Sequence, residues 1–179
     1  MGTWGVKVFD NDSALDWISE IEEEKDLSLV FVKLIEVVKQ NSDNIDEALI
    51  DADLASEALV SIEIIAALLK KPCCELPQQI SKWLKNKKLP DRRLISFFTN
   101  LVRDGVMGKD FKIEWKNSTY KEKWNFIVRS LKHYSLQVLE IIKNKSELNE
   151  LWKEDSISYQ NWVNLLKNLY ERLNDLEVS

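Results

Sequence analysis

The chain of 179 residues is poor in the residues that turn or break a backbone, with only four glycines and three prolines. This scarcity argues against collagen-like, low-complexity and turn-rich β architectures. No uncharged run reaches the roughly 18 residues of a membrane-spanning helix, so we expect no membrane partner. The first residues also lack the basic-then-apolar pattern of a secretory signal. Because 45% of the residues are hydrophobic, we expect a single domain over residues 1–179 with a substantial core.

Cysteine and histidine are scarce as well. The two cysteines, Cys73 and Cys74, are adjacent, which is a poor spacing for a structural disulfide or for a metal site, so we expect reduced thiols and a cytoplasmic location. His133 is the only histidine, which excludes zinc sites built on two or more histidines. The sequence contains no phosphate-binding glycine loop and no hydrolase or metalloprotease motif. We therefore expect a protein that is not an enzyme and that holds no cofactor and no metal.

Charge is divided unevenly along the chain, although the formal net charge is only −5. Residues 1–57 contain 15 acidic residues and four lysines, whereas residues 58–179 contain 15 acidic and 21 basic residues. Both halves could be solvated helix faces. The sharper interpretation is an acidic surface that attracts a basic partner.

The middle of the chain is basic and contains interspersed aromatic residues, as some nucleic-acid binders do. Residues 70–145 hold 18 Lys or Arg against seven acidic residues, and Trp83, Tyr120 and Trp124 lie among them. These aromatics mostly fall on apolar stripes, so packing explains them better. We do not expect nucleic acid as a partner.

Apolar residues recur at helical spacing through most of the chain, which predicts an all-α bundle of seven or eight helices. The expected helices cover about 13–24, 26–40, 53–69, 77–86, 91–104, 119–143, 146–155 and 158–176, with a short turn at 45–51. In the first helix, Leu15, Ile18 and Ile21 are expected to face inward, with Trp17 beside them.

Two stretches do not follow the helical pattern. Residues 1–9 predict a short extended arm, because Val6 and Val8 alternate with Lys7 after a glycine-bracketed start. Residues 105–115 contain two glycines and then alternate like a strand. A single strand would have no partner, so we expect a loop there.

The predicted helix at 53–69 is apolar on several sides, and Glu63 is its only charged residue between Glu57 and Lys70. A carboxylate so enclosed needs a partner, because an unpaired buried charge is very costly. Our hypothesis is that backbone amides or the amine of residues 1–5 supply it, which would make Glu63 a structural anchor. The residues expected to form this anchor are Glu63, Gly2, Trp4, Asp10, Asn11, Asp12, Asp16 and Trp17. As an alternative, Glu63, Asp12 and Asp16 would form a catalytic acidic cluster.

Several short motifs resemble those of a bacterial family, domain of unknown function 4259. They are Met-Gly-Thr-Trp-Gly at 1–5, Phe-Asp-Asn-Asp at 9–12, Asp-Trp at 16–17, the alanine-rich helix with Glu63, Ser-Glu-Leu at 146–148, Leu-Trp at 151–152 and Trp162. The resemblance implies the family's fold and a bacterial cytoplasmic setting, but no catalytic residue. Residues 90–125 depart from the family pattern, so we expect an insertion there.

The resemblance also favours an immunity role, because some relatives are thought to lie beside toxin genes. We therefore predict a non-enzymatic immunity protein that neutralises a bacterial toxin by occlusion, as in toxin–antitoxin complexes or contact-dependent growth inhibition. The cognate toxin is expected to be basic, with a nuclease as one class. The residues expected to contact it are Glu20, Glu22, Glu23, Glu24, Asp43, Asp46, Glu47, Asp51 and Asp53. The alternative is an enzyme or metal-dependent protein that uses an acidic cluster near the N-terminal arm.

Overall fold

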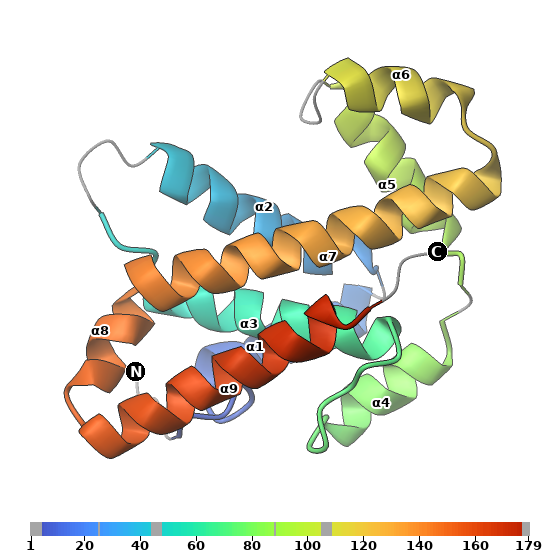
Figure 1. Cartoon of the computed structure of the whole chain (residues 1–179). Helices are drawn as coiled ribbons and strands as arrows, with labels where there is room; N and C mark the ends of the chain where they lie inside the picture. Colours follow the sequence, from blue (N-terminus) through green and yellow to red (C-terminus); the bar gives the residue numbers. More distant parts are fainter. Residues whose placement is uncertain (1–4, 25, 44–47, 88, 105–108, 177–179) are drawn as a thin grey trace.

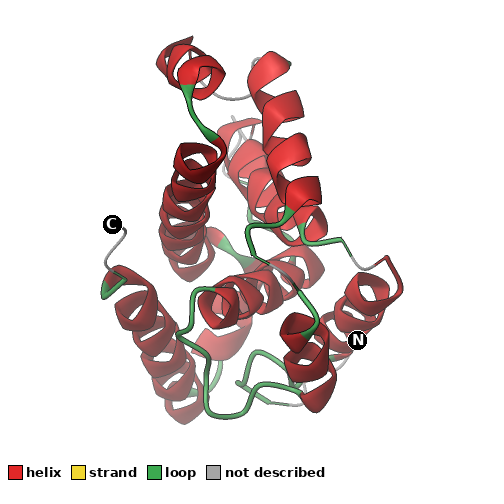
Figure 2. Ribbon diagram, turned by 90° about the vertical axis from the view of Figure 1, so that its right-hand side faces the viewer, coloured by secondary structure: helices red, strands yellow, loops and turns green. Residues whose placement is uncertain are grey.

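The computed structural model describes residues 5–24, 26–43, 48–87, 89–104 and 109–176, with the side chains of 109–111 excepted. Within these residues the chain forms nine α-helices and no strand. Figure 1 shows how the helices are arranged, and the ribbon in Figure 2 has helices and loops only. They are α1 (Asp12–Glu24), α2 (Ser28–Asp43), α3 (Ala52–Leu68), α4 (Gln78–Lys85), α5 (Arg92–Arg103), α6 (Lys109–Asn117), α7 (Tyr120–Lys145), α8 (Glu147–Lys153) and α9 (Ser156–Asn174). The predicted all-α class is confirmed, and the described residues form nine helices where seven or eight were expected. None of the described helices has the length and apolar character needed to cross a membrane.

Helix α3 is the centre of the bundle. Residues 58–66 are all buried, and α1, α2, α7, α8 and α9 all contact this helix. Its alanines and serines let the neighbouring backbones approach closely. Asp51 caps its N-terminus by accepting hydrogen bonds from the backbone N–H groups of Asp53 and Leu54 at 2.9 and 3.3 Å. The helix predicted at 53–69 is therefore confirmed, and neighbouring helices cover it on several sides.

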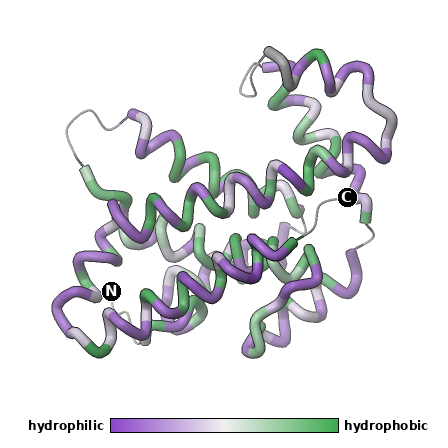
Figure 3. Tube along the Cα trace, viewed as in Figure 1, coloured by the Kyte–Doolittle hydropathy of each residue, from purple (hydrophilic) through white to green (hydrophobic). Residues whose placement is uncertain are grey.

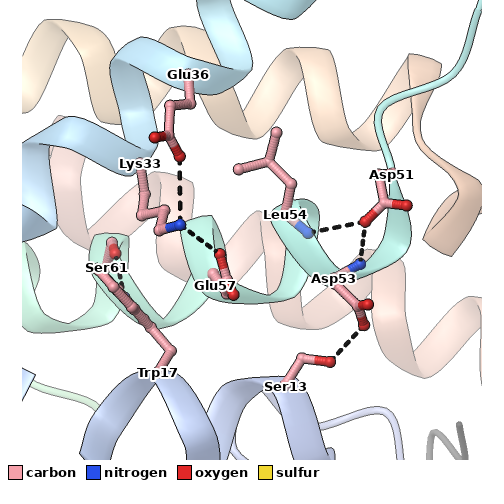
Figure 4. Close-up of polar contacts among 9 residues, drawn as sticks. All are labelled: Ser13, Trp17, Lys33, Glu36, Asp51, Asp53, Leu54, Glu57 and Ser61. Carbon is pink, nitrogen blue, oxygen red and sulfur yellow. Dashed lines mark hydrogen bonds and ion pairs between the residues drawn. The ribbon is translucent and has the colours of Figure 1, made fainter. Parts of the chain in front are cut away.

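Polar contacts attach α1 and α2 to this central helix (Figure 4). The indole N–H of Trp17 donates to the Ser61 hydroxyl at 2.9 Å, and the Ser13 hydroxyl donates to the Asp53 carboxylate. From α2, which runs antiparallel to α3, the Lys33 ammonium lies 2.8 Å from the Glu57 carboxylate. The contacts hold α1 and α2 in register with α3.

One prediction for α1 is wrong. The inward face consists of Ala14, Trp17, Ile18 and Ile21, whereas Leu15 is 51% exposed. Positions 14, 17, 18 and 21 follow the helical spacing i, i+3, i+4 and i+7, so they share one face, and position 15 lies about 100° away from it.

The described part of the N-terminal arm is not extended. Residues 6–10 form bends and a turn, and the backbone N–H of Asp10 donates to the Lys7 carbonyl at 3.2 Å. The turn buries Val8. The Asn11 carboxamide oxygen then accepts a hydrogen bond from the Ala14 backbone N–H at 2.7 Å, which caps the start of α1.

Helices α7 and α9 pack along α3, and hydrophilic and hydrophobic residues alternate along both of them (Figure 3). Thr119 and Glu122 form a capping box at the start of α7, which then runs unbroken to Lys145. Ser146 caps α8 and also makes a parallel bridge with Ile50, just before α3. This bridge joins the α7–α8 corner to the start of the central helix.

The expected loop at 105–115 is wrong for its described part, because α6 begins at Lys109 and ends at Asn117; residues 105–108 lie outside the described chain. The Trp115 ring is buried and stacks on Phe98 of α5, with ring centroids 6.4 Å apart. This packing of Trp115 stabilises the helix and outweighs the weak strand-like alternation of residues 111–115. Together α5 and α6 form a lobe that projects beside the first turns of α7 (Figure 1).

Phe98 gives a test of how this lobe is attached. It is fully buried and lies 4.7 Å from the Phe31 ring of α2, between centroids. Replacing Phe98 with Ala should lower the free energy of unfolding by about 3–5 kcal/mol, because a large core cavity is created. Urea denaturation measures this loss. The control is Thr99→Ala, a change at the exposed neighbour of Phe98, which should alter the free energy of unfolding by less than about 0.5 kcal/mol. If Phe98→Ala and Thr99→Ala had the same effect, the packing described here would be wrong.

Candidate functional site

A pocket of about 290 Å³ opens where the N-terminal arm, α3, the loop after α3 and α9 meet. The arm contributes residues 7–10, the loop contributes residues 73–75, and α3 contributes Glu63. From α9 come Leu165, Asn168 and Arg172. Groups far apart in the sequence therefore converge on the charged residue that the sequence marks as exceptional.

Glu63 is paired with Arg172. Only 4% of the Glu63 side chain is exposed, and 17% of that of Arg172. The two guanidinium nitrogens donate to the two carboxylate oxygens, Nη1 to Oε2 at 3.0 Å and Nη2 to Oε1 at 2.5 Å. The same guanidinium donates to the Lys71 carbonyl at 2.8 Å and to the Asn168 side chain at 2.9 Å. This two-pronged geometry is the strong form of an Arg–carboxylate pair.

The sequence predicted that Glu63 has a partner, and this is confirmed, but the partner is one that sequence analysis missed. Gly2 and Trp4, expected in the anchor, lie outside the described residues. Among the described residues the carboxylate receives its charged hydrogen bonds from Arg172. The sequence did contain a signal for Arg172. It lies directly beside Leu173 and three residues after Leu169, two leucines that are buried, so its side chain starts near the inward face of the last helix.

The rim of the pocket carries a second, exposed ion pair. The Lys7 ammonium lies 2.6 Å from the Glu75 carboxylate, and both side chains are more than half exposed. Hydrogen bonding to Glu75 raises the pKa of Lys7. Beside it, Asp10 folds over Gly5, where a Cβ atom would lie 2.6 Å from the Asp10 Oδ2 atom. Glycine at position 5 therefore gives the Asp10 side chain its room.

The Cys73 thiol at the pocket does not have the lowered pKa of an activated nucleophile. Burial, and next the charge of Glu63, raise the pKa of the half-buried Cys73 to about 11, so its thiol is protonated at neutral pH. Cys74 is exposed. His133 is exposed on α7 and does not line this pocket.

The proposed acidic cluster is not assembled. Asp12 and Asp16 are exposed on the outer side of α1, whereas Trp17 on the inner side packs on α3 and Glu63 faces α9. Within the described residues, no group of three or more His, Cys, Asp or Glu is placed to hold a metal ion.

The acidic residues expected to bind a partner fall into two groups. Glu20, Glu22, Glu23 and Glu24 lie near the end of α1, whereas Asp43, Asp51 and Asp53 lie where α2 ends and α3 begins. Asp46 and Glu47 are outside the described residues. Because α2 has 16 residues, its length of roughly 24 Å separates the groups. Asp51 and Asp53 are also occupied by the contacts that hold α3 and α1.

A comparison with protein families matches residues 2–164 to the model described as "Domain of unknown function (DUF4259)". The chain belongs to this family. The matched part of the DUF4259 domain includes Glu63 but ends before Arg172, so the partner of the buried carboxylate lies in the part of α9 beyond it. The match runs through residues 90–125, and their origin as an insertion stays a prediction. No curated protein and no solved structure matches the chain.

The ion pair predicts a large cost when one partner is removed. Arg172→Met should lower the free energy of unfolding by about 3 kcal/mol, because it leaves the Glu63 carboxylate buried and unpaired. Glu63→Gln should cost a similar amount. The double variant should lose clearly less than the sum of the two, since neither charge remains. Urea denaturation of all four proteins measures the coupling, and strictly additive losses would contradict a direct pair.

The two thiols should react at different rates. At pH 8, iodoacetamide should alkylate Cys74 about 100-fold faster than Cys73, because the raised pKa of Cys73 leaves little thiolate and its side chain is half-buried. Peptide mass spectrometry over time distinguishes the two sites. The labelling rate of Cys73 should keep rising with pH up to about 11, where its thiol is half ionised, and equal rates at pH 8 would refute the environment described for Cys73.

Proposed function

We propose that this DUF4259 protein is a non-enzymatic immunity protein that binds a basic bacterial toxin and blocks it by occlusion. The observation that supports this proposal best is the outer face of α1. There, Leu15 is 51% exposed among acidic side chains. We name the acidic face as Leu15, Asp16, Ser19, Glu20 and Glu23.

The members of the acidic face are neighbours on the helix. Positions 15, 16, 19, 20 and 23 are spaced by three or four residues and so form one stripe. All five side chains are exposed. The opposite side of α1 is held rigidly, because Trp17 is buried and hydrogen-bonded to Ser61. The stripe is therefore presented on a preorganised element, which reduces the entropy lost on binding.

The composition of the acidic face suits a protein partner. Binding surfaces commonly combine a central apolar side chain with a polar rim that excludes water. The carboxylates would steer a basic partner toward α1 and raise the association rate. A nuclease is one class of basic toxin, since its substrate groove must attract phosphates.

The pocket at Glu63 lends further support to a binding role. Its buried carboxylate and guanidinium are paired with each other, and its half-buried thiol is protonated at neutral pH. The ion pair attaches α9 to α3, and the protonated thiol adds no charge to the pocket.

Association kinetics test the proposal. The partner to measure is the product of the gene immediately upstream, produced with this protein and purified as a complex. The triple variant Asp16→Lys, Glu20→Lys and Glu23→Lys should lower the association rate constant at least tenfold at 50 mM salt, because the attraction becomes repulsion. The difference should shrink at 500 mM salt, where charges are screened.

Two comparisons sharpen this test. Reversal of three exposed acids outside α1, Glu140, Glu154 and Glu171, changes the net charge equally and should affect the association rate much less. Leu15→Ala should instead raise the dissociation rate, because the apolar contact holds the formed complex. The absence of a complex, or equal effects of the two triple variants, would defeat the proposal.

A further inference from the structure

Three helix ends meet at one corner of the projecting lobe. Helix α5 begins at Arg92, α6 ends at Asn117 and α7 begins at Tyr120. The Tyr120 hydroxyl donates to the Pro90 carbonyl at 3.3 Å, which places the starts of α5 and α7 side by side. Only three residues separate Lys116 from Tyr120, so their Cα atoms are at most roughly 14 Å apart.

Cationic side chains gather at this corner. Arg92 and Arg93 are in the first turn of α5, Lys116 is in the last turn of α6, and Lys121 is in the first turn of α7. All four are exposed. Within the part of the chain that the structure describes, none of the four takes part in an ion pair.

Three carboxylates lie near these helix ends, and each has a partner other than the four cations. Asp91 accepts a hydrogen bond from the Leu94 backbone at 2.9 Å. Glu122 bonds to Thr119 in the capping box, and these hydrogen bonds lower the pKa of Glu122. Glu114, two residues before Lys116 on α6, lies 3.9 Å from the Arg129 guanidinium. With Arg129 counted, three carboxylates against five cations leave the corner positive.

Tyr120 adds an exposed aromatic ring to the charge. Its side chain is 48% exposed, whereas Trp83 is buried and Trp124 is half-buried in the core. Packing therefore explains the two tryptophans, as expected from the sequence, but it does not explain Tyr120. We name Arg92, Arg93, Lys116, Tyr120 and Lys121 the basic corner.

We propose that the basic corner binds single-stranded nucleic acid, with its cations on the phosphates and Tyr120 stacked on an unpaired base. A positive surface that carries an exposed aromatic ring is the common design of sites for single strands, since every base offers a face for stacking. Duplex DNA would hide those faces. The site is separate from the acidic face of α1, which would repel a phosphate backbone, so binding at the corner does not depend on the proposed immunity role.

Fluorescence anisotropy of the full chain with labelled 20-nucleotide oligo(dT) and oligo(U) tests the proposal at 50, 100 and 200 mM NaCl. Affinity should fall as salt rises, with a slope of about −0.7 per phosphate contacted. The double variant Arg92→Glu with Arg93→Glu should bind at least tenfold more weakly and should have a slope smaller by about 1.4, because two phosphate contacts are lost.

Tyr120 distinguishes stacking from a merely structural role. Tyr120→Phe removes the hydrogen bond to Pro90 but keeps the ring, so it should retain affinity. Tyr120→Ala should weaken binding about 5- to 100-fold without changing the salt slope, because it removes stacking and no charge. Circular dichroism checks that each variant is folded, and equal affinities of the Phe and Ala variants would exclude stacking and overturn the proposal.

The control is a double reversal of exposed lysines on α7 and α9, Lys143→Glu with Lys167→Glu, which should weaken binding far less than the change at the corner. Polyaspartate serves as a second probe. The proposal is overturned if no oligonucleotide binds at 50 mM NaCl, if both double reversals have the same effect, or if polyaspartate competes as well as oligo(dT). The last result would identify a surface for an acidic protein instead.

Discussion

The pairing of Glu63 with Arg172 is the constraint on which the arrangement of the bundle depends. A carboxylate in the middle of an apolar helix is tolerated only with a partner of opposite charge and good geometry. Arg172 meets that requirement through two hydrogen bonds, and Asn168 and the Lys71 carbonyl hold its guanidinium in place. Because the donor is on α9, the pair sets how far that helix slides along α3.

The end of α9 is held by a second cation. The Lys132 ammonium of α7 donates to the carbonyls of Asn174 and Leu176 at 2.8 and 2.9 Å, which is favourable at a helix C-terminus. Helix α9 is therefore attached to α3 through Arg172 and to α7 through Lys132. The pocket at the N-terminal arm lies beside this attachment, and Asn168 and Arg172 of α9 line it.

The charges of the molecule are separated in space as well as in sequence, although less simply than the counts indicate. Some acidic residues of the first third serve the fold, as Asp51 does in capping α3 and Glu57 does in pairing with Lys33. The acids left on the outer side of α1 make the acidic face. Basic residues of the middle third gather where the lobe of α5 and α6 joins α7. One domain thereby presents surfaces of opposite charge on different elements.

Sequence patterns determined the helical class, the central position of α3 and the need of Glu63 for a partner, because each follows from local spacing and from the cost of burying charge. They did not identify Arg172, which is 109 residues away, since no local pattern encodes which helix covers a given face. They also placed Leu15 inside and missed α6. Only the tertiary structure decided these two features. Leu15 is exposed because α1 turns its Trp17 face to α3. Helix α6 forms because Trp115 stacks on Phe98, although the residues of α6 by themselves only weakly favour a helix.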